Sequence, residues 1–337
     1  MTTYQSSGVN IAAGARATEL MADAVRSTHS SAVLAGLGAF GGCFDLAAAL
    51  GDEPAQRPIL VASTDGVGTK TLVATTLGRY DTVGQDLVNH CINDILAQGA
   101  RPLFFMDYIA MAKVDPRQVA EMVGGCVAAC HAAGCALLGG ETAEMPDIYL
   151  AGAFDLAGTI IGVVERARML PRDVTAGDAI LALPSSGLHT NGYSLARAVF
   201  GERYAERPVE LGGQSIGEAL LAIHRPYLRE VTTLWEAGVP IHALAHITGG
   251  GLYDNLPRVL PSGLGAAIQR ESWDIPPIFE LLVQMGQLSE REAFHALNMG
   301  LGMLIVVPPD ATEAALHALP EVRLVGKIVV GNDVQLL

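Results

Sequence analysis

Residues 59–70 read Ile-Leu-Val-Ala-Ser-Thr-Asp-Gly-Val-Gly-Thr-Lys. The apolar run of residues 59–64 predicts a buried strand, which Asp65-Gly66 ends in a loop. Glycines expose backbone N–H groups, Lys70 adds a cation, and Asp65 offers a hard oxygen ligand for Mg2+. The loop is not a Walker A motif, because Thr69 stands where that motif has glycine before lysine. We therefore favour a phosphate-binding loop over a plain tight turn.

A helix over residues 83–98 follows this loop. Its apolar residues fall on one side, while five polar residues cluster on the other; these are Asp86, Asn89, His90, Asn93 and Asp94. This polar face contains no Lys, Arg, Glu or Gln, although such long side chains are the better helix formers on a solvated surface. Both interpretations stay open at this point, a solvated surface and a functional site.

The remaining pattern alternates strands, helices and polar loops. A helix is expected from Asp115, an N-cap before proline, to Gly134, followed by a strand at 135–138 and a Gly-Gly turn with acidic residues at 141, 144 and 147. A strand at 179–183 opens a second unit. Its glycine-rich loops at 185–192 and 246–251 carry His189 and His246, and either histidine is structural or catalytic. The pattern predicts a two-domain α+β protein, each domain a sheet flanked by helices.

Composition narrows the class of protein. The 337 residues carry a formal net charge of -14, which argues against a duplex nucleic-acid partner. No run of residues is apolar and long enough for a membrane span, and five cysteines without paired spacing predict reduced thiols. Only three lysines occur, Lys70, Lys113 and Lys327, so a lysine ending the glycine-rich loop is unlikely to serve only solvation. The match of Gly36-Leu-Gly38-Ala-Phe-Gly41 to a dinucleotide fingerprint is weak, because position 56 is Gln rather than an acid.

Several blocks together resemble the phosphoribosylformylglycinamidine cyclo-ligases, also called aminoimidazole ribonucleotide synthetases, of purine biosynthesis. The matching blocks are GLGAFGG from residue 36, STDGVGTK from 63, DLVNHCINDILAQGARPLFFMDY from 86, GGETAEMPD from 139, SSGLHTNGYSL from 185, HITGGGLYDNLPRVLP from 246 and NMGLGM from 298. The resemblance covers nearly the whole chain in order. It implies a PurM-like fold with an ATP-binding and dimerisation domain at 1–168 and a substrate-contacting domain at 169–337.

The resemblance also implies a reaction and its residues. ATP phosphorylates the formamide-derived oxygen of formylglycinamidine ribonucleotide, and an internal nitrogen then closes the imidazole ring and expels phosphate. This ligase chemistry needs positioning and electrostatic control rather than a protein nucleophile. The implied catalytic residues are Asp94, His189 and Lys70. The implied ATP contacts are Asp65, Gly66, Gly68, Thr69, Lys70, Asp94 and Glu141, of which Asp65, Asp94 and Glu141 would hold Mg2+. The implied substrate contacts are Gly38, Gly41, Ser186, His189, Asn191, His246, Thr248 and Gly249.

The chain departs from the family pattern near its start. Gln5, Asn10 and His29 stand where relatives usually carry Lys, Asp and a basic residue. Either other cations such as Arg79 or Arg101 compensate, or affinity for one ligand is reduced. The resemblance further implies a cytoplasmic homodimer that pairs its first domains through their sheets. Two alternatives stay open: a sister kinase such as a thiamine-phosphate kinase, and a non-catalytic nucleotide-binding protein.

Overall fold

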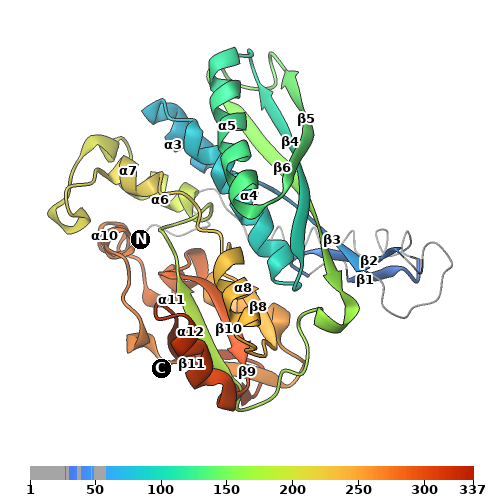
Figure 1. Cartoon of the computed structure of the whole chain (residues 1–337). Coiled ribbons are helices and arrows are strands. Elements are labelled where there is room, and N and C mark those ends of the chain that lie inside the picture. Colours follow the sequence, from blue (N-terminus) through green and yellow to red (C-terminus); the bar gives the residue numbers. More distant parts are fainter. Residues whose placement is uncertain (1–26, 28–29, 36–38, 47, 49–57) are drawn as a thin grey trace.

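The computed structural model describes residues 27, 30–35, 39–46, 48 and 58–337. The predictions for Gln5, Asn10, His29 and Gly38 lie outside these residues. Within the described part, the chain builds two six-stranded sheets, which Figure 1 shows one above the other. The mixed helices and sheets confirm the α+β class. The predicted division after residue 168 falls between the last strand of one sheet and the first strand of the other, and it stays a prediction.

The first sheet has the strand order β1-β2-β3-β6-β4-β5. Its strands are β1 (Val33–Ala35), β2 (Gly42–Asp45), β3 (Pro58–Gly66), β4 (Arg101–Met111), β5 (Ala136–Glu144) and β6 (Phe154–Glu165). As expected, the run at residues 59–64 is a strand, and it pairs antiparallel with both β2 and β6. Buried Ile59 and Val61 point to the same face, because side chains of a strand alternate between its two faces.

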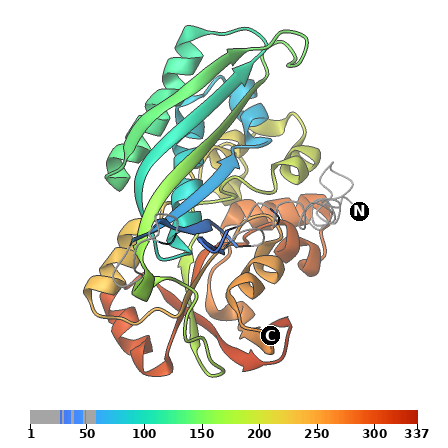
Figure 2. The same ribbon diagram turned by 90° about the vertical axis from the view of Figure 1, so that its right-hand side faces the viewer.

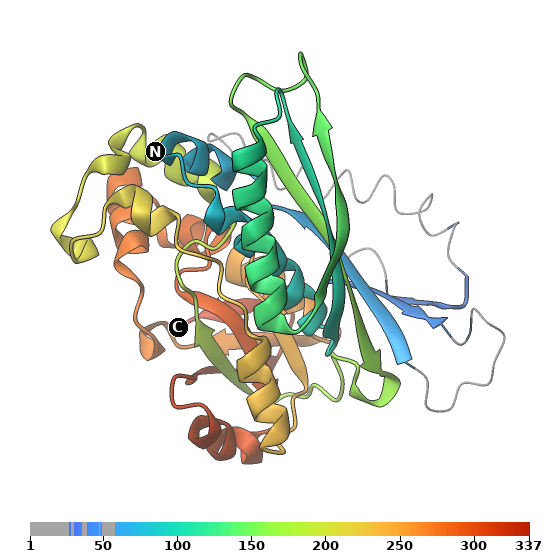
Figure 3. The ribbon, with the colours of Figure 1, turned by 45° about the horizontal axis from the view of Figure 1, so that its top comes forward.

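Two helices cover that face, α4 (Asp81–Leu96) and α5 (Pro116–Ala133), and Figure 3 shows them lying along the sheet. The predicted caps of α5 are confirmed, since Asp115 accepts from the backbone N–H of Arg117 and Gly134 ends the helix with a left-handed backbone. The lack of a side chain at Gly84 allows the two helices to pack closely. A Cβ on Gly84 would stand 2.0 Å from the Met122 carbonyl oxygen, so a larger residue there would force the helices apart.

The expected Gly-Gly turn after residue 138 is wrong. Gly139 and Gly140 continue β5, which runs on to Glu144 and pairs in parallel with β4 over Phe104 to Met111. The reason is that the eleven-residue β4 offers backbone hydrogen-bond partners along its full length. Glu141 and Glu144 are therefore strand residues, and the turn comes only at residues 146–148, where Asp147 has a φ of 68°.

The second sheet has the strand order β12-β9-β11-β7-β10-β8. Its strands are β7 (Ala179–Pro184), β8 (Ala243–His246), β9 (Leu264–Ile268), β10 (Leu301–Val307), β11 (Arg323–Val330) and β12 (Val334–Leu336). Every residue of β10 is buried, as its continuous apolar sequence requires for a central strand. The helices of this half are α6 (Tyr193–Phe200), α7 (Ile216–Leu220), α8 (Leu228–Glu236), α9 (Gly251–Asn255), α10 (Pro277–Gly286), α11 (Glu290–Ala296) and α12 (Thr312–Ala318).

The two halves meet along α3 (Lys70–Leu77) and α4. In Figures 1 and 3, α3 lies beside α6 and α7, and the close contact of Leu77 with Gly217 agrees with this placement. All five residues of the polar face of α4 are buried. Asn89 donates to the His224 carbonyl at 2.7 Å, and Asn93 accepts from the Tyr227 backbone N–H at 2.9 Å. The solvated-surface interpretation of this face is therefore wrong.

Two further expectations concern membranes and thiols. No described helix is long and apolar enough to cross a membrane. All five cysteines are free, and four of them are buried.

Candidate active site

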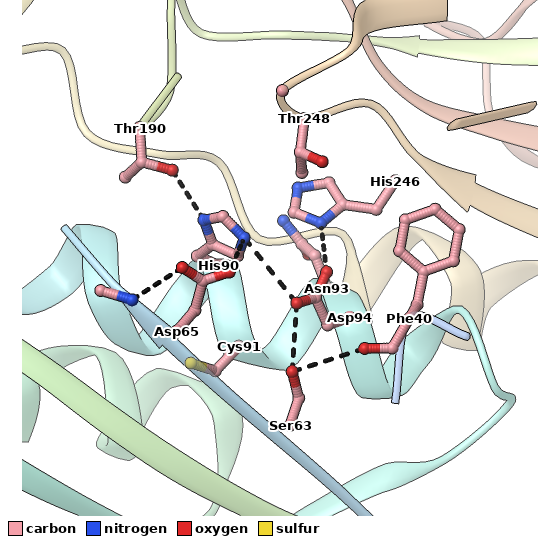
Figure 4. A network of polar contacts seen from close by, with 12 residues as sticks. Phe40, Ser63, Asp65, His90, Cys91, Asn93, Asp94, Thr190, His246 and Thr248 are labelled. Carbon is pink, nitrogen blue, oxygen red and sulfur yellow. Dashed lines mark hydrogen bonds and ion pairs between the residues drawn. The ribbon is translucent and has the colours of Figure 1, made fainter. Parts of the chain in front are cut away.

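Two carboxylates converge on one histidine at the junction between the halves (Figure 4). Asp65 stands near the end of β3, and Asp94 lies on α4 one helical turn after His90. The His90 Nε2 atom is 2.8 Å from Asp65 Oδ2 and 3.7 Å from Asp94 Oδ2. The structure therefore brings together two residues that the sequence analysis placed in one magnesium site, with an imidazole between them.

The charge of His90 follows from its neighbours. Burial by itself lowers the pKa of His90, but the charges of Asp65 and Asp94 outweigh this effect and raise that pKa to about 9. Burial likewise raises the pKa of Asp65, and the contact with His90 reverses this, so the net direction is down. At neutral pH His90 is thus an imidazolium that balances part of the charge of the two carboxylates.

Asp94 also orients a second histidine. His246 at the end of β8 is fully buried, and its Nδ1 lies 2.8 Å from Asp94 Oδ1. Because an ionised carboxylate only accepts, the proton of this hydrogen bond sits on His246 Nδ1. The hydroxyl of Ser63 donates to the other Asp94 oxygen at 3.1 Å. Both partners hold the carboxylate of Asp94 in place.

The loop at 185–192 brings His189 to the same junction. Its backbone has a φ of 61°, which is uncommon for a residue with a side chain. The backbone N–H of Ser186 donates to His189 Nε2 at 3.2 Å, so the ring proton is on Nδ1. Both this Nδ1 and Asn191 Nδ2 are buried, and neither has a hydrogen-bond partner among the described residues. Two unpartnered donors in one loop indicate a place for acceptor atoms of a ligand.

Four histidines gather around this point, since His224 stacks on His189 with ring centroids 4.0 Å apart. The Nε2 atoms of His224 and His246 face each other at 3.1 Å. The nitrogens of His189, His224 and His246 are close enough for a metal, but the arrangement does not suit one. Ser186 already occupies the lone pair of His189, and two stacked rings cannot both point their nitrogens at one ion. Burial lowers the pKa values of His189 and His224 well below 6.5, which keeps both rings neutral.

Lys70 does not lie where the phosphate-loop interpretation expects it. Its side chain is fully buried, and its ammonium is 2.8 Å from Asp86 Oδ2. It also donates to the carbonyl oxygens of His189 at 3.1 Å and Ala222 at 2.7 Å. Two of its N–H donors thus go to backbone carbonyls of the second half, and its charge faces the Asp86 carboxylate. In this arrangement the Lys70 side chain is directed toward the second half of the molecule.

Glu141 also stands apart from the other two predicted metal ligands. Gly66, Ala157, Tyr108 and Glu141 form one row across the sheet, with two strands between the first and the last. Three strand spacings amount to about 14 Å. Exposed Tyr108 shows that this row points to the face opposite α4. Within one chain, therefore, Glu141 does not join Asp65 and Asp94 in a single ion site.

The other predicted ATP contacts form the turn between β3 and α3. Gly68 has a φ of 66° and open space around it, so its backbone can approach a ligand. The hydroxyl of Thr69 lies 3.3 Å from that of Ser194 on α6. Asp65 Oδ1 accepts from the Gly66 backbone N–H at 2.7 Å, which orients the carboxylate.

The remaining predicted substrate contacts are described residues on several loops. Thr248 and Gly249 follow β8, and the Asn255 side chain binds the Thr248 hydroxyl and the carbonyl oxygens of both residues. Gly249 also lies close to Asn191, since a Cβ on Gly249 would stand 3.2 Å from the Asn191 side chain. Ser186 donates its hydroxyl to the Ile223 carbonyl. Gly41 packs tightly against Val61.

The two arginines that were expected to compensate for the missing cations have other neighbours. Arg79 pairs with Asp81 on the surface, and Arg101 lines a different groove of about 470 Å³. Arg258 instead covers the Phe40 ring and donates to the Ala39 carbonyl at 3.0 Å. Its charge acts on Asp94, which the sequence alone did not suggest.

His90 and His224 were absent from the predicted site residues. The polar face of α4 contains no Lys, Arg, Glu or Gln, and this feature of the sequence was the signal that pointed to His90. His224 follows an apolar segment without any motif of its own, so only the folded chain reveals it.

The chain was compared with known proteins. Residues 45–164 match the family described as AIR synthase related protein, N-terminal domain, and residues 175–337 match AIR synthase related protein, C-terminal domain. A phosphoribosylformylglycinamidine cyclo-ligase of Alkaliphilus oremlandii is 44% identical over 337 residues, which span 98% of this chain and 97% of the relative.

Solved structures share the fold at lower identity. Thiamine-monophosphate kinase from Stenotrophomonas maltophilia is 21% identical with a TM-score of 0.62, and 95% of each chain is covered. A second structure, AaThiL complexed with AMPPCP and TMP, is 15% identical with a TM-score of 0.64 over 94% of this chain and 92% of the other.

Proposed function

The chain belongs to the phosphoribosylformylglycinamidine cyclo-ligase family, and from this premise we propose how its residues close the imidazole ring. The reaction of the family consumes ATP and formylglycinamidine ribonucleotide and releases 5-aminoimidazole ribonucleotide, ADP and phosphate. The γ-phosphoryl group goes to the formamide-derived oxygen. The attacking nitrogen forms the new C–N bond, loses a proton and expels phosphate. The observation that carries the proposal is the convergence of Asp65, Asp94, His189 and His246 at one junction.

Asp65 and Asp94 fit the role of magnesium ligands. Both carboxylates lie beside the His90 Nε2 atom, so a cation that took the place of this imidazolium would meet two hard oxygens. Mg2+ bound there would neutralise charge on the transferring phosphoryl group. Gly68 and Thr69, at the end of the turn between β3 and α3, would provide backbone N–H groups for the phosphates. Binding of AMPPCP by AaThiL, a protein of the same fold, supports the use of ATP.

The histidines suit the proton and oxygen chemistry of the reaction. The Nδ1–H of His189 donates to the substrate oxygen that receives the phosphoryl group, because this buried donor has no partner in the part of the chain that the structure describes. His246, oriented by Asp94, and His224 face each other with two nitrogens that can share one proton. This pair accepts the proton that the attacking nitrogen loses. No protein nucleophile takes part.

The proposal is tested with purified protein, ATP and either of two second substrates. We expect ADP release with formylglycinamidine ribonucleotide, together with aminoimidazole product detected after diazotisation. ADP release with thiamine monophosphate and none with formylglycinamidine ribonucleotide would favour the sister-kinase alternative. ATP binding in calorimetry without ADP release under either condition would favour a non-catalytic nucleotide-binding protein. Rescue of a purine-requiring strain would place the activity in the cytoplasm, where we propose that it acts.

A homodimer follows from the open face of the first sheet. Figure 2 looks onto this face, which no described helix covers. Its side chains are largely apolar and only partly buried, among them Phe104, Met106, Tyr108, Ile161 and Val163. A strand that is apolar on both faces is typical of a sheet covered on both sides. A second copy of this chain, paired sheet to sheet, is the partner we propose.

The dimer is tested by analytical ultracentrifugation. Met106→Asp places a charge in the open face and should convert the dimer into monomers. Val209→Asp, at an 88% exposed apolar residue of the other half, serves as the matched control and should stay dimeric. A wild-type protein that sediments as a monomer at micromolar concentration would contradict the proposal.

A further inference from the structure

The ion pair between Lys70 and Asp86 belongs to the first half of the molecule and contacts the second half. Lys70 begins α3, Asp86 lies on α4, and both side chains are fully buried at 2.8 Å from each other. The other two donors of Lys70 go to the backbone carbonyls of His189 and Ala222, which belong to the second half. The negative charge of Asp86, 2.8 Å away, stabilises the charged form of this ammonium in its buried site.

Asp86 contacts the second half as well. Its Oδ1 accepts from the backbone N–H of His224 at 2.7 Å. One ion pair of the first half therefore binds the backbone of both stacked histidines: Lys70 holds the carbonyl of His189, and Asp86 holds the N–H of His224. The His189 and His224 rings lie face to face with an interplanar angle of 19°.

The contact with His189 explains its unusual backbone. A φ of 61° costs a residue with a side chain on the order of 1 kcal/mol, so it persists only where other contacts require it. The His189 carbonyl is held by Lys70 and lies 3.1 Å from the hydroxyl of buried Tyr193. With the carbonyl turned inward, the imidazole reaches the Ser186 N–H, and its Nδ1 proton is left for a ligand.

We propose that the Lys70–Asp86 pair is a positioning element for the reaction, which sets the orientation of His189 and His224 through their backbones and makes no contact with phosphate. The inference rests on the proposed function and adds to it. A phosphate-binding lysine would have to leave two backbone carbonyls and its carboxylate partner in a fully buried site, and that carboxylate would then remain buried without its cation. The contacts therefore favour positioning.

Steady-state kinetics separate the two roles. Lys70→Met removes the charge and keeps the length of the side chain. Positioning predicts that kcat falls about 100-fold, as for a misplaced catalytic group, while KM for ATP changes less than twofold. A tenfold or greater rise in KM for ATP with normal kcat would show a phosphate contact and overturn the proposal.

A double variant controls for loss of stability, because Lys70→Met alone leaves the carboxylate of Asp86 buried and charged without its partner. Lys70→Met/Asp86→Asn removes both charges and should regain thermal stability relative to the single variant. We expect its kcat to stay at least 30-fold below wild type. Recovery of kcat to within threefold of wild type would mean that the pair acts only on stability, which refutes the inference.

A spectroscopic measurement tests the inference without any turnover. Protein labelled with 15N-histidine reports the ring tautomers, and His189 should show its proton on Nδ1 in the wild type. This signal should shift in the double variant and stay unchanged in Asp178→Asn, a buried carboxylate that binds His242 away from the junction. An unchanged His189 signal in the double variant would overturn the positioning role. Because no substrate is present, this result is independent of whether wild-type protein forms the aminoimidazole product, which tests the proposed function itself.

Discussion

Replacing Asp94 by Asn tests the centre of the proposed site. The Asp94 side chain is buried, binds His246 at 2.8 Å and Ser63 at 3.1 Å, and lies 3.7 Å from His90. An asparagine of the same shape can still accept from His246 through its Oδ1, and its amide group can donate to the Ser63 hydroxyl. The polar contacts therefore persist, while the negative charge is lost.

The cost to stability follows from these contacts. Two hydrogen bonds to a charged oxygen become neutral ones, each weaker by about 1 kcal/mol, so the fold loses about 2 kcal/mol. The effect on turnover is larger, because one carboxylate of the cation site and the partner that orients His246 are both lost. Comparable losses cost about 10³-fold to 10⁴-fold in rate, which is about 4 to 5.5 kcal/mol of activation free energy.

The assay compares kcat for aminoimidazole formation with the melting temperature of the same preparation. Asp178→Asn is the matched control, since Asp178 is 2% exposed and binds His242 at 2.7 Å. The control should lose similar stability and keep its kcat. Turnover of the Asp94→Asn variant within tenfold of wild type would refute the reasoning about this carboxylate.

Three further perturbations have defined outcomes. His189→Gly relieves the backbone with φ of 61° but removes the Nδ1–H donor, so kcat should fall about 100-fold in steady-state assays, and a normal kcat would contradict the donor role. Burial lowers the pKa of His224 in the folded protein below 6.5. The stability contributed by the neutral His224 ring is therefore complete above pH 6.5, and it is lost as the pH falls toward the pKa of the folded state. The free energy of unfolding, measured with urea between pH 7.5 and 5.5, should therefore fall as the pH falls, and His224→Gln should reduce this slope by up to about 1.4 kcal/mol per pH unit. Identical slopes for the variant and the wild type would refute this. Removal of Mg2+ with EDTA should weaken ATP binding at least tenfold in calorimetry, with recovery on adding Mg2+, whereas metal-independent binding would argue against a cation at Asp65 and Asp94.

Much of the fold was predictable because its signals are local. The apolar run before Asp65, the caps at Asp115 and Gly134, and the loop before Tyr193 all depend on neighbouring residues, and the structure confirms each of them. The turn at Gly139 failed for the opposite reason. Glycine pairs predict a turn only when no neighbouring strand offers hydrogen bonds, and β4 offers them through to Met111.

The sequence by itself determined the α+β class, the family and the set of polar loops, since these depend on composition, order and short-range pattern. The tertiary structure alone decided which polar groups meet. It placed His90 between Asp65 and Asp94, added His224, and moved Glu141 to the opposite face of the sheet. It also showed that Lys70, whose loop first suggested phosphate binding, is neutralised by Asp86. The direction of a side chain depends on where a helix or strand packs, and that depends on contacts between residues far apart in the chain.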